Sequence, residues 1–277
     1  MRGADELLEQ LDLVRQGDET WRGSTPSGSG RPNLYGGMVA AQAMRAGNLS
    51  AGLGRRPHSI HAYFLSSGRF GEPLCFTVSP VRDGRSFSVR HVEVSQSSRR
   101  VMTMIASFQT PEVGDHYELV GADAPEPPEE SISQSTGWET GTGGDGPFEL
   151  VEGRVGPDRR GSLYWSVARY WAKARSPLPE DPGLHACALV AMGDLRSGHA
   201  PTIAMASHTP IRMTSLDYSV WFRTAALADR WMLFDIRAGG NGGGRGLTHG
   251  LVHAASGQVG SFAMEMLLRE ERLGATS

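Results

Sequence analysis

The chain has few cysteines. Its 277 residues include only Cys75 and Cys187. Each lies in an apolar run, so both are predicted to be small buried residues. Two cysteines are too few for a disulfide framework or a zinc site of their own. The histidines are scattered without the spacing of metal ligands. We therefore expect no metal and no cofactor.

Long apolar runs and basic runs are also missing. No stretch reaches the roughly 18 apolar residues of a membrane helix, and acids interrupt the leucines of the opening MRGADELLEQLDLV, unlike a signal peptide. The 27 basic and 30 acidic residues are mixed, which argues against a nucleic-acid-binding face. We expect a cytoplasmic protein without a membrane span and without a nucleic-acid partner.

Two segments consist of small and apolar residues on nearly all sides, and each is predicted to be a buried helix. They are Tyr35–Ala46 and Leu184–Leu195. Runs rich in β-branched and aromatic residues follow each helix and predict strands. In the first half these runs are Ser59–Leu65, Leu74–Val81, Ser86–Val94 and Val101–Phe108. In the second half they are Ser215–Phe222, Trp231–Arg237, Gly244–His253 and Gln258–Leu268.

The second half therefore repeats the order of elements in the first, and Arg245 falls 160 positions after Arg85. Each half is an antiparallel sheet that needs a helix to cover one face. Joining the two sheets edge to edge hides two exposed edges. The sequence predicts an α+β fold with two buried helices wrapped by one continuous antiparallel sheet. Its units are residues 1–115, an acidic Pro/Gly/Ser-rich linker at 116–160, and residues 161–277.

Several motifs, in order, resemble one known family. They are Arg31-Pro-Asn-Leu-Tyr35-Gly36-Gly37-Met38, His58-Ser-Ile-His61-Ala-Tyr63-Phe64, Arg82-Asp83-Gly84-Arg85-Ser86-Phe87, Ala106-Ser107-Phe108-Gln109-Thr-Pro111, Pro177-Leu-Pro179-Glu-Asp181-Pro182 and Ser215-Leu216-Asp217-Tyr218-Ser-Val-Trp221-Phe222. Together they span about Arg31 to Arg269. The chain is similar to the type II acyl-CoA thioesterases, and the resemblance implies the double hotdog fold.

The resemblance also implies a catalytic site in which an aspartate, a serine or threonine, and a glutamine hold a water molecule. Asp217 matches the aspartate. The hydroxyl position falls within 238–240, where no hydroxyl exists, and the glutamine position falls at or next to Met264. Asn241 and Glu265 are the nearest polar substitutes. We expect the catalytic residues Asp217, Asn241 and Glu265 to meet at the start of the first buried helix.

The same resemblance suggests the substrate contacts. Backbone N–H groups of Gly36 and Gly37, at a helix start, would face the thioester oxygen, and Arg245 would contact the phosphates of coenzyme A. The full expected set is Tyr35, Gly36, Gly37, Met38, Gly239, Gly240, Arg245 and Met264. Structural alternatives stay open: close packing for the glycine pair, a hairpin loop for 239–246, and a surface strand position for Asp217.

These residues favour an acyl-CoA thioesterase that hydrolyses fatty-acyl-CoA through water activated by Asp217. The alternative is a non-hydrolytic protein that binds acyl-CoA or an acyl carrier, because the hydroxyl and the glutamine are missing. A hotdog dehydratase is less favoured, because 35–38 lacks the histidine and carboxylate of such enzymes. The expected partners are an acyl-CoA or acyl-carrier thioester and further copies of the chain, in a homodimer or homotetramer.

Overall fold

The computed structural model describes residues 3–27, 33–114, 134–136, 146–160, 163–203 and 210–270. The described helices are α1 (Gly3–Leu11), α2 (Gly36–Ala51), α4 (Pro182–Gly193) and α5 (His199–Ile203). Among these residues no helix is both long and apolar enough to cross a membrane.

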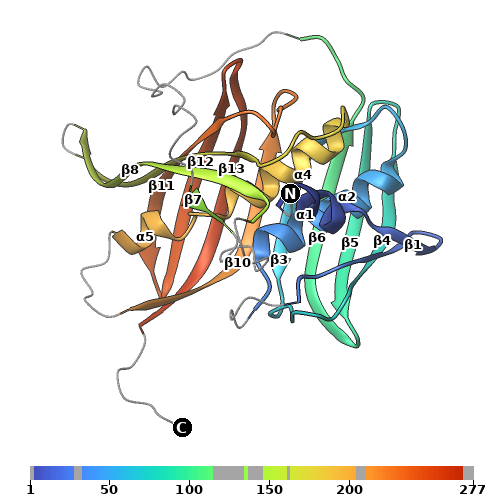
Figure 1. Ribbon diagram of the computed structural model, residues 1–277, viewed down its shortest axis with the longest axis horizontal. Coiled ribbons are helices and arrows are strands. Elements are labelled where there is room, and N and C mark those ends of the chain that lie inside the picture. The colour runs from blue at the N-terminus through green and yellow to red at the C-terminus, as the bar shows by residue number, and fades with distance from the viewer. Residues whose placement is uncertain are drawn as a thin grey trace.

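One antiparallel sheet contains every described strand, in the order β1-β2-β4-β5-β6-β3-β10-β13-β12-β11-β9-β8-β7. Figure 1 shows it curving around the helices. The strands of the first half are β1 (Val14–Gly17), β2 (Thr20–Gly23), β3 (Arg56–Phe64), β4 (Leu74–Asp83), β5 (Phe87–Gln96) and β6 (Arg99–Gln109). Those of the second half are β7 (Gln134–Ser135), β8 (Phe148–Arg160), β9 (Leu163–Ala174), β10 (Ile211–Phe222), β11 (Met232–Gly242), β12 (Arg245–Ala254) and β13 (Gly257–Glu270).

The internal repeat is confirmed by the strand order. The sequence β4-β5-β6-β3 on one side is matched by β11-β12-β13-β10 on the other, and the two sets meet where β3 pairs with β10. In that junction Ala62 lies opposite Tyr218 and Ile60 lies opposite Val220. All four side chains are buried. The predicted α+β double hotdog, with one continuous sheet, is therefore correct.

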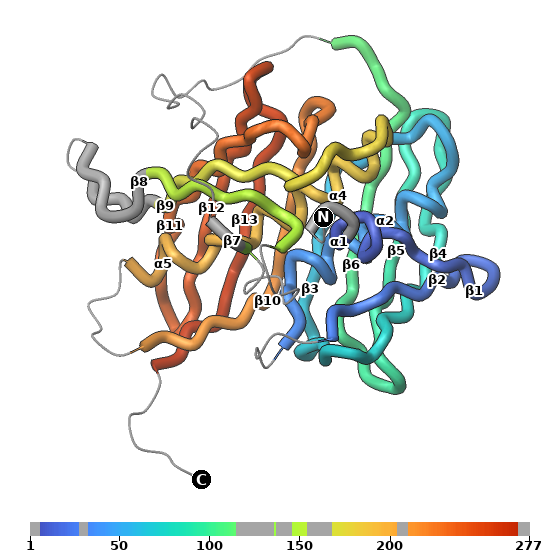
Figure 2. The backbone as a smooth tube through the Cα atoms, viewed as in Figure 1, coloured from blue at the N-terminus to red at the C-terminus, as the bar shows by residue number. Residues whose placement is uncertain are grey.

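Helices α2 and α4 lie together inside the curved sheet, one from each half of the chain, as Figure 2 shows. Both are buried on most sides, as their sequences predict. Cys187 is fully buried in α4, and burial raises the pKa of its thiol to about 12. Cys75 is only half-buried, because β4 alternates between covered and open positions.

The expected linker at 116–160 is too long. Its C-terminal part, Phe148–Arg160, is strand β8, which pairs with β9. Strands β1 and β2 extend the first half of the sheet by pairing with β4. The sequence signal was weak for β8, because its glycines and charged residues interrupt any apolar alternation.

Candidate active site

Three tyrosine hydroxyls bind the last turn of α4. Tyr35, before α2, donates to the carbonyl of Ala191 at 2.6 Å, and Tyr170, in β9, donates to Met192 at 2.7 Å. Tyr218, in β10, donates to Val190 at 3.0 Å. The final carbonyls of a helix lack the usual partner one turn further on, and these hydroxyls bind them. The carbonyl of Met192 also accepts from Leu195 N–H at 3.1 Å. The end of α4 is thereby fixed from both halves of the chain.

The residue that follows this turn is Asp194, the C-cap of α4. Its Oδ2 accepts a hydrogen bond from the N–H of Gly37 at 2.8 Å, and its Oδ1 accepts one from the hydroxyl of Ser197 at 2.9 Å. Gly37 lies in the first turn of α2. A carboxylate there is favoured by the free N–H groups and by the positive end of the helix dipole. The structure therefore joins the end of one buried helix to the start of the other through one carboxylate.

The two glycines at the start of α2 allow this close approach. A Cβ on Gly37 would lie 2.8 Å from the carbonyl oxygen of Ala191 and 2.8 Å from Cβ of Asp194. A Cβ on Gly36 would lie 3.1 Å from the ring of Phe64 and 3.3 Å from Oδ2 of Asp194. Within the described part of the chain, no residue accepts a hydrogen bond from the N–H of Gly36. That donor remains available beside the carboxylate.

The start of α4, at the other end of the helix pair, is built differently. Asp181 is the N-cap residue of α4, and its side chain accepts a hydrogen bond from Gly183 N–H at 2.8 Å. Arg45, from α2, holds the same carboxylate through Nη1 at 2.9 Å from Oδ2. Asn48 Oδ1 also lies against Gly183. Asn48 follows Gly37 by eleven positions, and Asp194 follows Gly183 by the same number, so the two residues are equivalent in the repeat. The start of α4 therefore has the side-chain amide of Asn48 where the start of α2 has the carboxylate of Asp194.

A bulge in β10 decides which side chains face the helices. The register against β13 shifts between Ser215 and Asp217. Ser215 lies opposite Met266 and Tyr218 lies opposite Met264, both fully covered on the helix side. Because side chains alternate along a strand, Ser215 shares the inner face with Met264. Ser215 therefore carries a hydroxyl on the inner face, whereas residues 238–240, where the resemblance places the family's hydroxyl, carry none.

Asp217 lies on the outer face, away from α2 and α4. It pairs with Glu265 in β13 and with Tyr63 in β3, which is 61% exposed. Its Oδ1 accepts a hydrogen bond from Glu265 N–H at 3.3 Å. Desolvation raises the pKa of Asp217, against the hydrogen bond from Glu265 N–H, and the nearby charge of Glu265 raises it further.

The expected meeting of Asp217, Asn241 and Glu265 at the start of α2 is therefore absent. Glu265 is near Asp217 but forms an ion pair with Arg245, with Nε and Oε1 3.0 Å apart. The side-chain amide of Asn241 donates to the carbonyl of Pro201 in α5, at 2.7 Å. The assignment went wrong because the two faces of a bulged strand cannot be separated from sequence alternation alone.

The glycine-rich segment after Ala238 contains the turn of the β11–β12 hairpin. Gly243 and Gly244 have φ of 57° and 72°, as a two-residue turn between twisted strands requires. Gly239 packs on the ring of His249, and Gly240 adopts a φ of 144°. Of the other expected contacts, Met264 is buried in β13 and Met38 is buried in α2.

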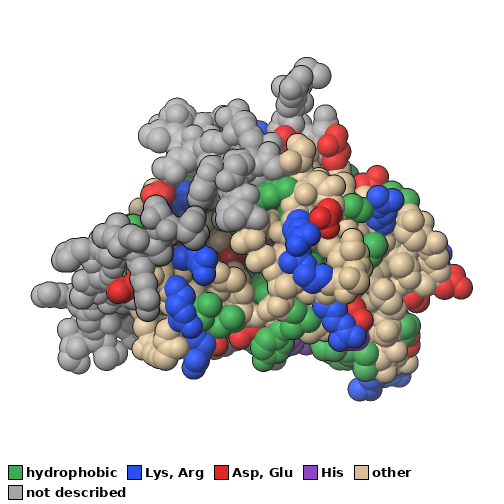
Figure 3. All heavy atoms as spheres, turned by 90° about the horizontal axis from the view of Figure 1, so that it is seen from below, with side chains coloured by type: hydrophobic (Ala, Val, Ile, Leu, Met, Phe, Trp, Pro, Cys, Tyr) green, Lys and Arg blue, Asp and Glu red, His purple; other side chains and the backbone are tan. Residues whose placement is uncertain are grey.

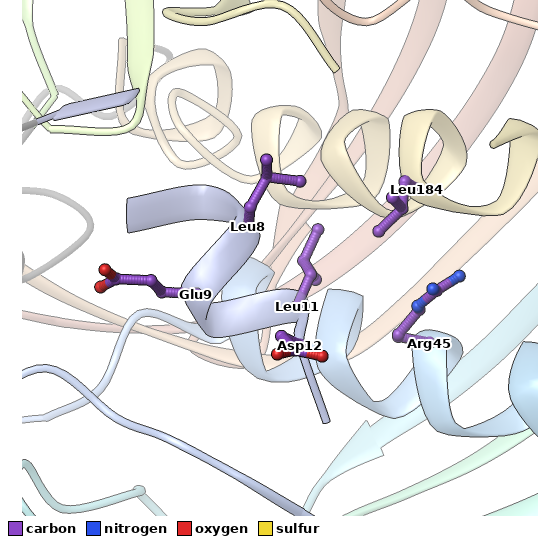
Figure 4. Close-up of a pocket in the computed structure, with 6 residues that line it drawn as sticks. All are labelled: Leu8, Glu9, Leu11, Asp12, Arg45 and Leu184. Carbon is purple, nitrogen blue, oxygen red and sulfur yellow. The ribbon is translucent and has the colours of Figure 1, made fainter. Parts of the chain in front are cut away.

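Two openings lie near the helices. A cavity of about 380 Å³ is lined by Leu8, Glu9, Leu11, Asp12, Arg45 and Leu184, as Figure 4 shows. Leu184 is ten residues before Asp194, or about 15 Å along a helix, so this cavity is remote from that carboxylate. A second cleft, of about 10 Å³, lies beside Tyr35 and Met38 at the start of α2. This cleft is much smaller, but it lies against the first turn of α2, which also contains the glycine pair.

Sequence reasoning missed Asp194. A signal was present: an acid that follows a glycine at the end of an apolar helix, where negative charge is normally unfavourable. No group of three or more His, Cys, Asp or Glu side chains within the described residues could hold a metal ion.

Comparison with known proteins agrees with this architecture. The profile described as the acyl-CoA thioesterase N-terminal domain matches residues 25–109, and that of the C-terminal domain matches residues 118–267. The structure of an acyl-CoA thioesterase II, TesB2, from Mycobacterium marinum is 32% identical, with a TM-score of 0.80, and the match covers 98% of this chain and 100% of that one.

Two curated proteins are also similar. Acyl-CoA thioesterase 2 of Haemophilus influenzae is 27% identical over 96% of this chain and 97% of its own length. Human acyl-coenzyme A thioesterase 8 is 28% identical over 85% of this chain and 80% of its own length. These names favour hydrolysis over the alternative of a protein that only binds acyl-CoA. The chain belongs to the acyl-CoA thioesterase family, whose members are thioester hydrolases.

Proposed function

We propose that this protein hydrolyses fatty-acyl-CoA with a water molecule that Asp194 holds and deprotonates. The observation that carries the proposal is the carboxylate of Asp194 at 2.8 Å from the N–H of Gly37, at the start of α2. A carboxylate positioned next to backbone N–H donors can act as a general base beside an oxyanion site. This replaces Asp217, whose side chain lies on the opposite face of the sheet.

The start of α2 supplies the second half of the chemistry. The N–H of Gly36 would donate to the thioester oxygen, on which negative charge develops as water attacks. The dipole of α2 would stabilise the same charge. The hydroxyl of Ser215, on the inner face, is the candidate for a further contact to the water or the thioester.

The steps balance without any added group. The water oxygen forms a bond to the carbonyl carbon, and Asp194 accepts the proton. The carbon–sulfur bond then breaks, and the thiolate of coenzyme A leaves and takes up a proton. The products are the free acid and coenzyme A. The acyl chain would enter the cleft beside Tyr35 and Met38, which must widen to receive it, since it holds at most one water molecule in its present form.

The test compares two isosteric variants, Asp194→Asn and Asp217→Asn, in a thiol-release assay with acyl-CoAs of several lengths. The amide oxygen introduced by Asp194→Asn can still accept from Gly37 N–H, so the fold should survive. We expect Asp194→Asn to lower kcat by about 10²–10⁴-fold and Asp217→Asn to retain most of it. The opposite ranking would restore Asp217 as the base and remove Asp194.

The finer identity of the thioester is also part of this proposal. We favour coenzyme A over a carrier protein, since the similar proteins are named for acyl-CoA. Comparing kcat/KM for one acyl group on coenzyme A and on acyl carrier protein tests the choice. A higher value for the carrier would reverse it.

We further propose that copies of this chain associate through the outer face at the β3–β10 junction. Tyr63 is 61% exposed there, Ile105 is 42% exposed and Trp221 is 40% exposed. The face spans the junction of the two repeats, so it has the approximate two-fold character that suits a self-complementary interface. Sedimentation of the wild type and of Trp221→Glu would test this. An unchanged mass in the variant would count against this face.

A further inference from the structure

Two arginines lie directly opposite each other near the open ends of β10 and β13. Arg212 pairs with Arg269 in the antiparallel register. Arg212 is two residues from Thr214, and Arg269 is two residues from Leu267, so each arginine lies on the same face as that neighbour, which is the outer face. Met213 and Leu268, between them, point inward. Like charges in directly opposed positions destabilise a sheet. Such a pair is favourable when an anion lies between the two side chains.

The surroundings add positive charge to this pair. Arg269 reaches the β11–β12 turn, where its Nη1 donates to the carbonyl of Gly244 at 3.0 Å. The next residue along the chain is Arg245. The three arginines therefore gather at one end of the outer face. Figure 3 views the molecule from the end at which β13 finishes, and Lys and Arg side chains form a row over its C-terminal half.

The acids nearby do not neutralise the pair. Glu265 is already bound to Arg245 at 3.0 Å. Glu270 lies opposite Ile211 and, by alternation, belongs to the inner face. Within the described residues no carboxylate lies within ion-pair distance of Arg212, which is exposed. The arginine fork is the side chain best suited to phosphate oxygens.

We propose that Arg212 and Arg269, with Arg245 beside them, form the site that binds the phosphates of coenzyme A. This inference rests on the proposed function, because it assigns the polar end of the same substrate. It goes beyond the single contact expected for Arg245 by naming the unneutralised cross-strand pair as the main anion site.

The position suits a substrate whose thioester lies at Asp194. On the inner face of the same strand, Met213 packs against Gly198, four residues after Asp194. Ser215 and Arg212 are three residues apart, or about 10 Å along a strand. The pantetheine arm would pass around the strand ends, so that the thioester lies on the inner side and the phosphates on the outer side.

Binding of free coenzyme A tests the site without any need for turnover. Calorimetry would compare the wild type, Arg212→Glu and the matched control Arg22→Glu, at an exposed arginine on β2. Arg212→Glu creates an ion pair with Arg269, so it should raise Tm while it weakens binding of coenzyme A by about ten-fold or more. Pantetheine, which has no phosphate, should bind all three proteins equally. A less than two-fold change for coenzyme A would overturn the proposal.

Hydrolysis then separates this inference from the proposed function. For Arg212→Glu we expect KM to rise for an acyl-CoA, while kcat is retained, and both constants to stay at wild-type values for the same acyl group on N-acetylcysteamine. Equal losses on both substrates would contradict a phosphate site. A wild type that binds coenzyme A through Arg212 but hydrolyses neither substrate would reject the hydrolytic function and keep the anion site.

Discussion

Asp194 and Gly37 are 157 positions apart in the chain, yet the carboxylate of one accepts a 2.8 Å hydrogen bond from the backbone of the other. The contact crosses from the second repeat to the first. It places a carboxylate at the positive end of α2 without using a residue of the segment that precedes that helix. Single substitutions at Gly37 and Tyr35 test the groups that position this contact, and substitutions at Asp217 and Asp235 test the carboxylates of the sheet.

The first prediction concerns Gly37→Ala. The new Cβ would lie 2.8 Å from the carbonyl oxygen of Ala191, so α2 and α4 must move apart. Overpacking of this kind costs about 1–3 kcal/mol. We expect a lower Tm together with a larger loss of kcat, measured by calorimetry and thiol release. Gly17→Ala is the control, because nothing lies within 4 Å of its added Cβ. A wild-type kcat in Gly37→Ala would show that this spacing does not matter.

The second prediction concerns Tyr35→Phe. It removes the donor to the carbonyl of Ala191 and leaves that buried oxygen without the hydroxyl. The expected cost is about 1–3 kcal/mol in the free energy of unfolding, with a reduced kcat because the end of α4 is less well fixed. Thr77→Val, which removes an exposed hydroxyl from β4, should change neither quantity. Urea unfolding would measure the first and thiol release the second. Equal stability of the two variants would argue against a role for the Tyr35 hydroxyl.

The third prediction concerns Asp217 and pH. Desolvation raises the pKa of Asp217 in the folded protein, and the charge of Glu265 adds to this effect. A raised carboxyl pKa means that the ionised form is disfavoured by folding, so stability is lost as pH rises through the folded pKa. Asp217→Asn should therefore stabilise the protein at pH 7 by less than about 1 kcal/mol, since the site is partly exposed. The gain should vanish below the unfolded pKa. Thermal unfolding at pH 3 and pH 7 would check this, and a loss of stability at pH 7 would contradict it.

The fourth prediction concerns the buried ion pair of Asp235. Burial alone would raise the pKa of Asp235, but the hydrogen bond from Arg169 at 2.9 Å and the charges of Arg169 and Arg237 together lower it. A lowered carboxyl pKa adds stability above the unfolded value, and this stability is lost as pH falls through the folded pKa.

Asp235→Asn removes the carboxylate that forms a 2.9 Å ion pair with Arg169, whose side chain is largely buried. We expect Asp235→Asn to destabilise the protein by about 3–5 kcal/mol at pH 7. The difference from the wild type should shrink as the pH approaches the folded pKa. Asp229→Asn, on a loop, serves as the control for a change of the same type. A pH-independent difference would show that packing, and not charge, causes the loss.

Composition and pattern were enough for the architecture. The apolar faces of 35–46 and 184–195 predicted both buried helices, and the order of the strands predicted the repeat. The need to hide two sheet edges predicted that the half-sheets join edge to edge, and the structure adds that β3 and β10 form the junction. Strand β8 was missed because its charged residues and glycines lack a period of two.

The site was harder to predict, for a physical reason. A single bulge determines whether the carboxylate of Asp217 or the hydroxyl of Ser215 faces the helices. Bulges leave no composition signal. Asp194 depends on a contact between residues 157 positions apart, which only the packing of α2 on α4 creates. The glycine pair was identified correctly as a close approach, although its partner was not.

The β3–β10 junction has a consequence for how the protein would fail under stress. It is the only strand pairing in the described sheet that joins the two repeats. The carboxylate of Asp194 and the backbone N–H of Gly37, which bind each other, come from opposite sides of this junction. Parting of these two strands would separate the reacting groups while each half kept its own strands paired. Mild denaturant should then abolish turnover before circular dichroism registers any loss of β-structure.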